Sequence, residues 1–293
     1  MEHYLSQKQG LVSKALGKYL PSASVFPPLI HRAMRYSVLN GGKRLRAVLA
    51  LMAGELLGAP NSKVMPYACA MEMVHAYSLI HDDLPAMDND DFRRGKPTSH
   101  KVFGEGMAIL AGDALLTYAF QLIADKIQDK SIVAKLVGEL SKAAGSVGMV
   151  GGQVLDILSA GLPVNRSTGR QLREIHLRKT GAMIIASCRG GAIIAGASGR
   201  QLAAITSYAR NFGLAFQIVD DILDVNGSKK QLGKTPGKDA KLNKLTYPAL
   251  KGLKASQEEA EYLIKQANKS LALFGKKADK LKELSDYLLT RNT

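Results

Sequence analysis

The sequence predicts an all-α protein, and three observations lead to this prediction. The long apolar segments are rich in Ala, Leu and Met, which are strong helix formers, and their apolar residues recur at helical spacing. The alternation of apolar and polar residues that marks strands is absent, and clusters of β-branched residues are rare. No internal repeat or low-complexity linker divides the 293 residues. We therefore expect one domain (1–293) of roughly ten helices, given typical helix lengths.

The expected helices follow one another along the chain. The strongest candidates in the first half are 45–57, 66–81 and 108–127, and 201–225 is a further long apolar helix. The segment 256–291 alternates charged and apolar residues, as exposed amphipathic helices do. Gly and Pro separate these segments. The expected breaks lie at Pro21, 27–28, 41–42, 58–60, Gly104, 151–152, 161–163 and 226–227.

The bulk composition argues against several classes of protein. The hydrophobic fraction of 46% is that of an ordinary globular protein. Cys69 and Cys188 offer neither a disulfide framework nor zinc-ligand spacing, so we expect a reducing, cytoplasmic compartment. The first residues lack the basic-then-apolar pattern of a signal peptide. Because no apolar run of about 18 residues is free of charges, we expect no membrane span.

The net charge of +15 leaves more than one interpretation open. A basic helical protein that binds nucleic acid without catalysis would explain it. However, the positive charge is spread along the chain, aromatic residues make up only 6%, and no DNA- or RNA-binding motif appears. We therefore expect a basic solvated surface or a site for polyanionic small molecules, and no nucleic-acid partner.

Two short acidic clusters are the most informative local feature. The first reads DDLPAMD (82–88), the second reads DDILD (220–224), and each stands at the end of an apolar stretch. Carboxylates this dense are costly where water is scarce, unless a cation neutralises them. Oxygen ligands favour Mg²⁺, which proteins usually hold with one or two carboxylates plus substrate phosphates. Two facing clusters would suit several Mg²⁺ ions around one polyphosphate.

The second cluster has helical spacing. On a helix, Asp220 and Asp224 share one face, whereas Asp221 points about 100° away. An isolated acidic triplet is often only a solvated helix end. The apolar residues before and within this cluster argue against full exposure.

In the first cluster, Pro85 should bend or end the helix. Asp82 and Asp88 are six positions apart, which a straight helix would not align, and the bend could bring Asp88 back toward Asp82. Arg93 and Arg94 follow, and a guanidinium group matches the geometry of phosphate oxygens.

A basic segment, GGKRLR (41–46), opens the helix expected at 45–57. Helix N-termini favour anions, and Lys and Arg add formal positive charge. The segment is not a P-loop, because the GxxxxGK[ST] pattern is missing. Alone it would more often be a solvated basic loop.

Seven segments, read in order, resemble the trans-prenyltransferases, the short-chain polyprenyl diphosphate synthases, over essentially the whole chain. The likeness is greatest to the bacterial farnesyl diphosphate synthases (geranyltranstransferases). Any one segment could mislead, whereas seven in order are highly specific. The segments are GGKRLR (41–46), HAYSLIHDDLPAMDNDDFRRGKPT (75–98), FGEGMAILAGDALL (103–116), GGQVLD (151–156), IHLRKTGAMI (175–184), FQIVDDILD (216–224) and LGKTPGKDAKLNKLTYPAL (232–250).

The resemblance implies an isoprenoid synthase-like fold, a helical bundle around a deep central cavity, usually assembled as a homodimer. The two acidic clusters would face each other across the cavity mouth and hold three Mg²⁺ ions on an allylic diphosphate. One departure from the family is Ala47, where proline usually follows GGKRLR. Ala is also a good helix former, and all charged positions are kept, so we expect an active enzyme.

The resemblance also implies a role for individual residues. The expected metal ligands are Asp82, Asp83, Asp88, Asp220, Asp221 and Asp224. The residues expected to grip the allylic diphosphate are Arg93, Lys179 and Lys234, with Lys244 as a further contact. The pocket for isopentenyl diphosphate would contain Lys43, Arg46, His75 and Arg94. The oxygens expected near the reacting carbons belong to Thr180 and Gln217, which with Lys179 and Lys234 make up the expected catalytic set.

The implied reaction joins isopentenyl diphosphate to dimethylallyl or geranyl diphosphate, giving (2E,6E)-farnesyl diphosphate and diphosphate by Mg-assisted ionisation, condensation and elimination. Tyr77 lies five residues before Asp82, about 7.5 Å along a helix. The resemblance implies that a bulky aromatic residue at position 77, with Ser78 beside it, stops chain growth at fifteen carbons. Ordinary core packing would also explain Tyr77.

Other enzymes remain open at this point. A geranylgeranyl diphosphate synthase shares every charged motif and differs only in the floor of the pocket. His81 next to Asp82 suggests an HD-type metal phosphohydrolase, but that class would leave the second acidic cluster unexplained, and we expect His81 to be a core histidine. A terpene cyclase or a head-to-head synthase shares acidic helices, but GGKRLR and the arginine pair indicate an isopentenyl diphosphate pocket, which cyclases lack.

Overall fold

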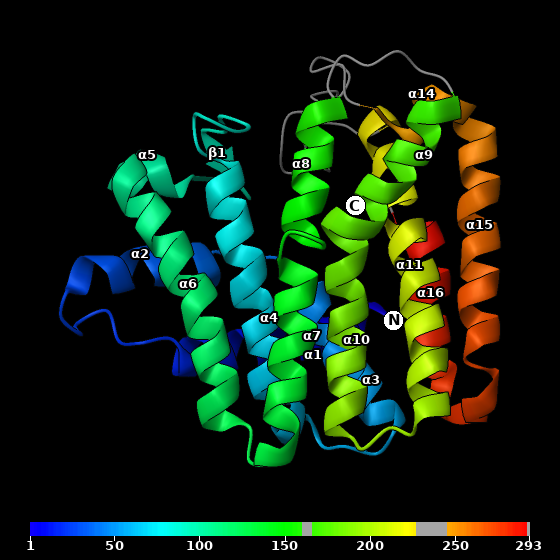
Figure 1. The fold of residues 1–293 in the computed structure, drawn as a ribbon, viewed down its shortest axis with the longest axis horizontal. Coiled ribbons are helices and arrows are strands. Elements are labelled where there is room, and N and C mark those ends of the chain that lie inside the picture. The colour runs from blue at the N-terminus through cyan, green and yellow to red at the C-terminus, as the bar shows by residue number, and fades with distance from the viewer. Residues whose placement is uncertain (160–165, 227–244, 292–293) are drawn as a thin grey trace.

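The computed structural model of the chain describes residues 1–159, 166–226 and 245–291. In these residues the fold is all-α, as the sequence predicts, and most of the long helices run alongside one another in a bundle, with α2 lying across their direction (Figure 1). The long helices are α1 (Glu2–Tyr19), α2 (Pro28–Leu39), α3 (Leu45–Leu56), α4 (Asn61–Asp82), α6 (Glu105–Lys126), α7 (Val133–Ala144), α8 (Met149–Ser159), α9 (Arg166–Ile175), α10 (Ala182–Ile194), α11 (Gly199–Asn226), α15 (Leu253–Ser270) and α16 (Asp279–Thr290). The short elements are α5 (Ser99–Phe103), α14 (Tyr247–Lys251), the 3₁₀-helices η1 (Lys130–Ile132) and η3 (Ala272–Ala278), the π-helix η2 (His176–Gly181), and the strands β1 (Phe92–Arg93) and β2 (Lys96–Pro97).

The helices α3 and α4 lie at the centre of the bundle. The helix α3 packs against both α4 and α10, and α4 packs against α6. Most residues of α3 and α4 are buried, so these helices are apolar on nearly every face rather than along one stripe. Their sequence composition therefore follows from their position.

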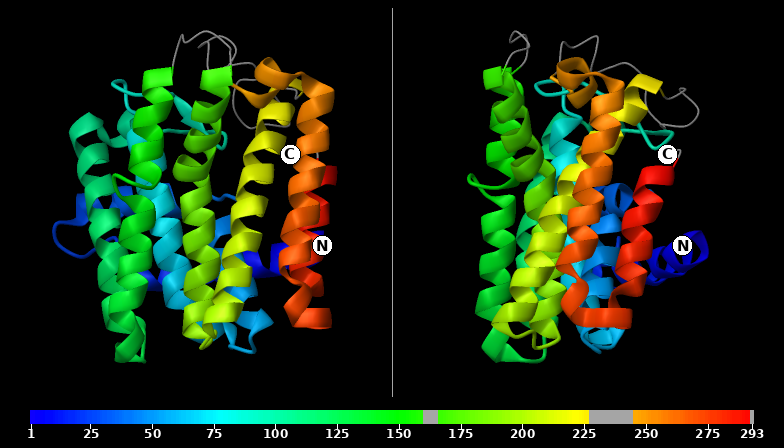
Figure 2. Two further views of the ribbon diagram at one scale, coloured as in Figure 1. Left: turned by 45° about the vertical axis from the view of Figure 1, so that its right-hand side comes forward. Right: turned by 90° about the vertical axis from the view of Figure 1, so that its right-hand side faces the viewer.

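The two ends of the chain lie on the same side of the bundle, where α1 approaches α16 (Figure 2). The Tyr287 hydroxyl on α16 donates a hydrogen bond to the Glu2 carboxylate on α1 over 3.2 Å. Glu2 and Tyr287 also line one large cavity, so both ends of the chain contribute to its wall.

A small hairpin differs from the sequence expectation, which contained no strands. The strands β1 and β2 pair antiparallel, with Phe92 opposite Pro97. Arg94 and Gly95 between them both have positive φ, as the favoured two-residue hairpin turn requires. Strands of two residues are too short to show any alternation in the sequence.

The break expected at 151–152 is wrong, because both glycines lie inside α8. A Cβ atom on Gly152 would stand 2.2 Å from the backbone nitrogen of Lys179. Glycine at this position therefore allows α8 to pack closely against η2, the turn that carries Lys179.

Of the described helices, α6 alone is long and apolar enough to cross a membrane by length and composition. The stricter sequence criterion asked for a charge-free run, which Asp113 interrupts. Core helices of soluble proteins meet the same length and composition test. In this structure α6 packs against α4 and α2, and 39% of its most apolar window is buried.

Candidate active site

Both acidic clusters lie at one end of the bundle, near the β1–β2 hairpin and α14 (Figure 1). The first cluster follows α4, which ends at Asp82 as Pro85 predicts. Beyond it the chain turns back, and the amide of Asp88 donates a hydrogen bond to the carbonyl of Asp82 over 2.8 Å. The predicted return of Asp88 toward Asp82 is confirmed.

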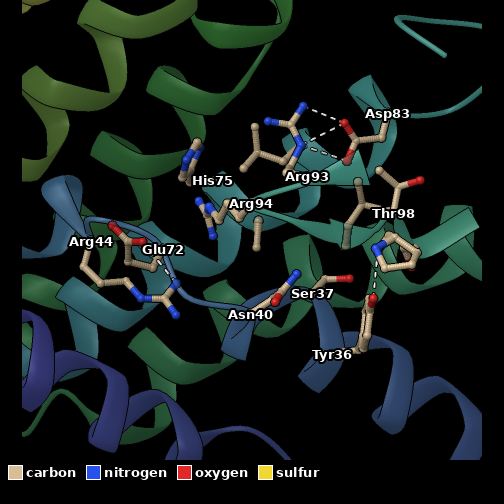
Figure 3. Close-up of a pocket in the computed structure, with 15 residues that line it drawn as sticks. Tyr36, Ser37, Asn40, Arg44, Glu72, His75, Asp83, Arg93, Arg94 and Thr98 are labelled. Carbon is tan, nitrogen blue, oxygen red and sulfur yellow. Dashed lines mark hydrogen bonds and ion pairs between the residues drawn. The ribbon is translucent and has the colours of Figure 1, made fainter. Parts of the chain in front are cut away.

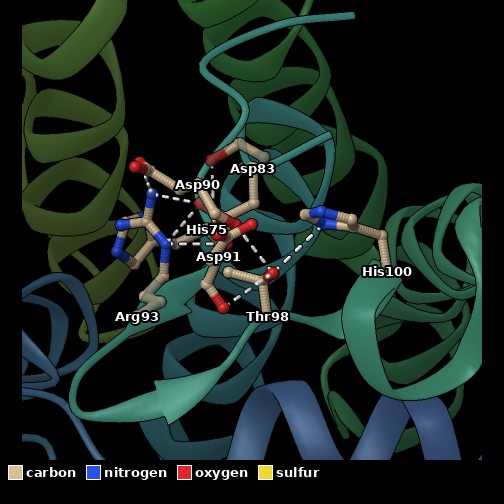
Figure 4. A network of polar contacts seen from close by, with 8 residues as sticks. His75, Asp83, Asp90, Asp91, Arg93, Thr98 and His100 are labelled. Atoms are coloured by element: carbon tan, nitrogen blue, oxygen red, sulfur yellow. Dashed lines mark hydrogen bonds and ion pairs between the residues drawn. The ribbon is translucent and has the colours of Figure 1, made fainter. Parts of the chain in front are cut away.

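Arg93 and Asp83 form a bidentate ion pair. Arg93 Nε lies 2.8 Å from both carboxylate oxygens of Asp83, and Arg93 Nη2 lies 2.5 Å from Oδ1 (Figure 4). Burial raises the pKa of Asp83, and the Arg93 guanidinium partly offsets that effect. Two residues expected to bind different partners, a metal and a diphosphate, thus pair with each other in this structure.

Thr98 fixes the loop that connects the first acidic cluster to α5. Its hydroxyl donates to the carbonyl of Asp90 over 2.7 Å, and its amide donates to the carbonyl of Asp91 over 3.0 Å. The Nδ1 atom of buried His100 lies 3.1 Å from the same hydroxyl (Figure 4). These contacts hold the segment that presents Arg93.

The negative charge of Asp82 is only partly neutralised by its surroundings. Burial raises its pKa to about 6; Lys179 lowers it, and the neighbouring Asp88 raises it further. In the described part of the chain, no three acidic, His or Cys side chains converge into a ready metal site. The oxygen donors of Asp82 and Asp88 therefore fit Mg²⁺ only together with oxygens from a bound diphosphate.

Lys179 contacts an acidic residue to which the sequence analysis assigned no role. Its Nζ atom lies 2.7 Å from Asp156 Oδ2, across the close contact between α8 and η2. Asp156 ends the GGQVLD segment, which belongs to the resemblance, so the motif itself was the available signal. Asp156 holds the ammonium group of Lys179 at the edge of the site.

Arg291 is a second residue of the site that was not expected from the sequence. Its guanidinium Nη2 pairs with Asp220 Oδ1, and its Cζ atom lies 4.4 Å from the centroid of the Phe216 ring. The Arg291 side chain is only 7% exposed. Nothing in the sequence around Arg291 signals this pairing, which depends on α16 packing beside α11.

A cavity of about 920 Å³ brings together most of the residues expected to bind isopentenyl diphosphate. Burial lowers the pKa of Lys43 and of Arg46. Burial, followed by the charges of Arg46 and Arg94, lowers the pKa of His75 well below its usual value. The wall of this cavity carries more cationic than acidic side chains, which favours an anionic ligand. The predicted site residues that line this cavity are Lys43, Arg46, His75, Arg93, Arg94, Thr180, Gln217 and Asp220.

A narrower pocket lies beside this cavity, under the hairpin (Figure 3). Here Arg94 donates from Nη1 to the carbonyl of Gly41 over 2.6 Å. A Cβ atom on Gly42 would meet the Arg94 guanidinium at 2.5 Å, and Gly42 has φ of +112°. The glycine pair of GGKRLR therefore leaves room for this arginine.

Buried Glu72 connects the same pocket to α3. Its carboxylate lies 3.7 Å from Arg44 Nη1 and accepts a hydrogen bond from the amide of Ala47 over 3.2 Å. A proline at position 47, as the family usually has, would lack this donor. The departure from the family thus has a structural counterpart in Glu72.

Tyr77 and Ser78 lie on α4, and neither lines the 920 Å³ cavity. The Tyr77 ring is buried and meets His81 edge to face, with 5.7 Å between ring centroids. The Ser78 hydroxyl donates to the carbonyl of His75 over 2.9 Å. The roles of Tyr77 and Ser78 in chain length stay predictions.

His81 packs against α6. Its Nε2 atom lies 3.1 Å from the carbonyl oxygen of Ile109, and a Cβ atom on Gly112 would collide with the ring. The side chain is 30% exposed, so it lies at the edge of the core rather than inside it. The predicted ligands Lys234 and Lys244 lie outside the described residues.

The remaining aspartates of the second cluster, Asp221 and Asp224, are both buried. Asp221 Oδ2 accepts a hydrogen bond from the amide of Tyr247 over 2.9 Å. His176 lies beside it, and burial lowers the pKa of His176 to about 4. Neither His176 nor Tyr247 belongs to the site residues expected from the sequence.

Comparisons with known proteins agree with this geometry. The chain matches the family model described as "Polyprenyl synthetase" over residues 27–287. It is 47% identical to the farnesyl diphosphate synthase of Geobacillus stearothermophilus over 274 residues, covering 92% of this chain and 91% of that protein. It is 43% identical to the geranylgeranyl diphosphate synthase of Cyanophora paradoxa over 291 residues, covering 99% and 96%. The solved apo structure of an FPP/GFPP synthase from Zymomonas mobilis is similar, with a TM-score of 0.86, 34% identity and 98% of each chain covered.

Proposed function

Because the chain belongs to the polyprenyl synthetase family, we propose that it makes (2E,6E)-farnesyl diphosphate from isopentenyl diphosphate and dimethylallyl or geranyl diphosphate. The chain is a trans-prenyltransferase. Its relatives divide between farnesyl and geranylgeranyl diphosphate synthases, so the fifteen-carbon product is the part that the proposal adds.

The observation that carries the proposal is the basic wall of the 920 Å³ cavity, which reaches the second acidic cluster at Asp220. We assign the diphosphate of isopentenyl diphosphate to Lys43, Arg46 and Arg94. His75, whose low pKa keeps it neutral near pH 7, can contribute a hydrogen bond without adding charge. The buried Nδ1 of His75 and Nε of Arg46 have no hydrogen-bond partner in the described residues, which suits a ligand that accepts hydrogen bonds.

We assign Mg²⁺ to the aspartates of both clusters, with three ions when the allylic diphosphate is bound. The raised pKa of Asp82 supports this assignment, because burial and the neighbouring Asp88 make its negative charge costly until a cation arrives. When bound, Mg²⁺ would neutralise the charge that grows on the departing diphosphate. The proposed Mg²⁺ ligands are Asp82, Asp83, Asp88, Asp220, Asp221 and Asp224.

The residues of the chain would bind and orient the allylic substrate. Arg93 and Lys179, with Lys234, grip its diphosphate while the C–O bond breaks to give an allylic cation and pyrophosphate. Thr180 and Gln217 line the cavity, where their oxygens would stabilise the cation, and the reaction requires that water be kept from it. The double bond of isopentenyl diphosphate then attacks, and pyrophosphate takes the proton that is lost in the elimination.

The length of the product would be set on α4. The buried aromatic ring of Tyr77 lies within the last two turns before Asp82, where it can stop a growing chain, with Ser78 beside it. The alternative is a geranylgeranyl diphosphate synthase, which the relative from Cyanophora paradoxa favours.

We further propose that the chain acts as one domain and as a homodimer, in the cytoplasm and without a nucleic-acid partner. A single domain is supported by the cavity that both chain ends line. Dimerisation is supported by four exposed apolar residues whose spacing puts them on one face of α8, because contiguous exposed apolar residues often mark protein–protein interfaces. The exposed residues are Val150, Val154, Ile157 and Leu158. The buried free thiols of Cys69 and Cys188 agree with a reducing compartment.

The proposed activity is tested by following the release of pyrophosphate with isopentenyl and dimethylallyl diphosphate, with Mg²⁺ or with excess EDTA. We expect elongation only with Mg²⁺, and a loss of roughly 10²–10³-fold in Asp82→Asn and in Asp220→Asn. The matched control is Asp125→Asn, an exposed carboxylate on α6, which should keep wild-type activity. Elongation that persists in EDTA would contradict the metal assignment, and no elongation by folded wild-type protein would contradict the function.

A further inference from the structure

We propose that His176 is a positioning residue for the second acidic cluster: it holds the Asp221 carboxylate against the π-helical turn that carries Lys179. The proposal rests on the proposed function, because it concerns the same site. It links two parts of the site that come from different helices, the diphosphate-binding lysine and the metal-binding aspartates.

The first observation is the π-helix itself. The segment η2 begins at His176 and includes Lys179 and Thr180, between α9 and α10. Single π-turns inside α-helices occur frequently at functional sites, because the extra residue changes the direction of the side chains that follow. His176 is buried, and its ring belongs to the same turn as the two predicted catalytic side chains.

The second observation is the contact with Asp221. Nε2 of His176 lies 3.5 Å from Asp221 Oδ2, and the two side chains are only 6% and 10% exposed. The same oxygen accepts the hydrogen bond of 2.9 Å from the amide of Tyr247. Asp221 Oδ2 thus faces η2 and the start of α14, and its direction is fixed from two sides.

The third observation is what holds the imidazole. Its ring stacks on the Tyr247 ring, with 5.9 Å between centroids and 22° between planes. Tyr247 is itself held at the start of α14, where the Thr246 hydroxyl accepts a hydrogen bond from the amide of Ala249. Tyr247 belongs to TYPAL (246–250), the end of the seventh segment that resembles the family. The metal and substrate assignments use no residue of TYPAL, and the stacking on His176 gives Tyr247 a role.

The orientation of the imidazole identifies the nitrogen that acts. Nε2 faces Asp221, whereas Nδ1 is buried and has no hydrogen-bond partner in the described part of the chain. We assign the ring hydrogen to Nε2, because that tautomer gives the carboxylate a donor. Outer-shell partners of this kind orient metal-binding carboxylates, and their loss typically costs about 10- to 100-fold in metal affinity.

The test compares three variants of the full chain. His176→Phe keeps a ring to stack on Tyr247 but has no donor, His176→Gln places an amide nitrogen near the position of Nε2, and His176→Asn places it nearer to Nδ1. Binding of Mg²⁺ with inorganic pyrophosphate is measured by calorimetry. We expect His176→Phe and His176→Asn to lose roughly 10- to 100-fold in affinity. His176→Gln should stay within about threefold of the wild type, because the donor itself is retained.

Steady-state kinetics add a readout that a general loss of packing would not give. The KM for dimethylallyl diphosphate should rise in His176→Phe and recover in His176→Gln, while the KM for isopentenyl diphosphate changes little. Wild-type affinity in a folded His176→Phe would overturn the proposal, and so would equal losses in the Phe and Gln variants. If the Phe variant does not fold, the comparison of Asn with Gln decides in the same way.

A double-mutant cycle with Asp221→Asn tests the contact directly. If His176 acts through Asp221, His176→Phe should add little to the loss already caused by Asp221→Asn, whereas independent, additive losses would contradict the proposal. Failure of the wild type to bind Mg²⁺ with pyrophosphate, or to elongate, would count against the proposed function. Failure of the variants alone to differ from the wild type would count only against His176.

Discussion

Ion pairs neutralise part of the charge of the site. Three cationic groups each have a carboxylate within contact distance, and two of these carboxylates belong to the acidic clusters. Binding of metal and diphosphate therefore exchanges internal partners for new ones, which limits the net gain in free energy. The pairs are Arg93 with Asp83, Lys179 with Asp156, and Arg291 with Asp220.

Asp82 should make the protein less stable at neutral pH. Its folded pKa is raised to about 6, so between about pH 4 and pH 6 the folded state binds more protons than the unfolded state. The free energy of unfolding therefore falls as pH rises through this window. Asp82→Asn, measured by urea denaturation without Mg²⁺, should stabilise the protein by on the order of 2 kcal/mol at pH 7.5 and by little at pH 4.

The exposed control Asp125→Asn should change the free energy of unfolding at pH 7.5 by less than about 0.5 kcal/mol. An equal effect of Asp82→Asn at both pH values would show that ionisation of Asp82 does not lower the free energy of unfolding.

Tyr77 provides the test of chain length at the scale of one side chain. Tyr77→Ala should move the main product from fifteen toward twenty carbons, because the truncation removes a buried ring close before Asp82. The products are dephosphorylated and sized by mass spectrometry. Tyr262→Ala, which removes an exposed ring on α15, is the control and should leave the distribution unchanged. An unchanged distribution in Tyr77→Ala would assign Tyr77 to ordinary packing.

At the scale of elements, long helices follow from the sequence, whereas irregular turns do not. The helix expected at 45–57 is α3, and the helix expected at 201–225 is α11. The hairpin after Asp91 and the π-turn at His176 were not predicted, because both depend on a few backbone angles and on neighbours distant in sequence. The glycines at 151–152 read as a break, since the sequence does not reveal that Gly152 faces the backbone of Lys179.

Gly152 allows a test of that close contact between elements. Gly152→Ala would place a Cβ atom 2.2 Å from the amide nitrogen of Lys179, so α8 or η2 must move. We expect a loss of about 1–3 kcal/mol in the free energy of unfolding, as for other overpacked sites, and a weaker grip on the allylic diphosphate.

The matched control is Gly138→Ala on α7, where a Cβ atom meets nothing within 4 Å. This change should stabilise the protein by about 0.4–1 kcal/mol, because it removes freedom from the unfolded chain. Equal effects of the two substitutions on chemical denaturation would contradict the proposed packing role of Gly152.

At the scale of the whole molecule, the site is built from both halves of the chain. The wall of the 920 Å³ cavity combines Arg46 and Arg94 from the first half with Gln217 and Asp220 from the second. The motifs predicted the family, which is confirmed, and they predicted the residues of the site, which stay a prediction. They could not predict Asp156, His176 or Arg291 as partners, because those contacts arise only when α8, η2 and α16 pack together.

The proposed homodimer can be tested by substituting an exposed apolar residue of α8. Wild-type protein, with a chain mass of 31.5 kDa, should sediment as a dimer at micromolar concentration. Leu158→Glu places a charge on a side chain that is 66% exposed on the proposed interface, and should shift the protein toward monomer. Leu273→Glu, an exposed leucine on η3, should leave the dimer intact. A monomeric wild type, or a dimer that Leu158→Glu does not weaken, would contradict this interface.

The central claim is prenyl elongation that stops at fifteen carbons, and product analysis tests it most directly. Purified protein is incubated with Mg²⁺, dimethylallyl diphosphate and excess isopentenyl diphosphate, and the dephosphorylated products are sized by mass spectrometry. We expect mainly farnesol. Mainly geranylgeraniol would retain the chemistry and contradict the role of Tyr77, and no elongation by folded, Mg²⁺-supplied protein would contradict the account as a whole.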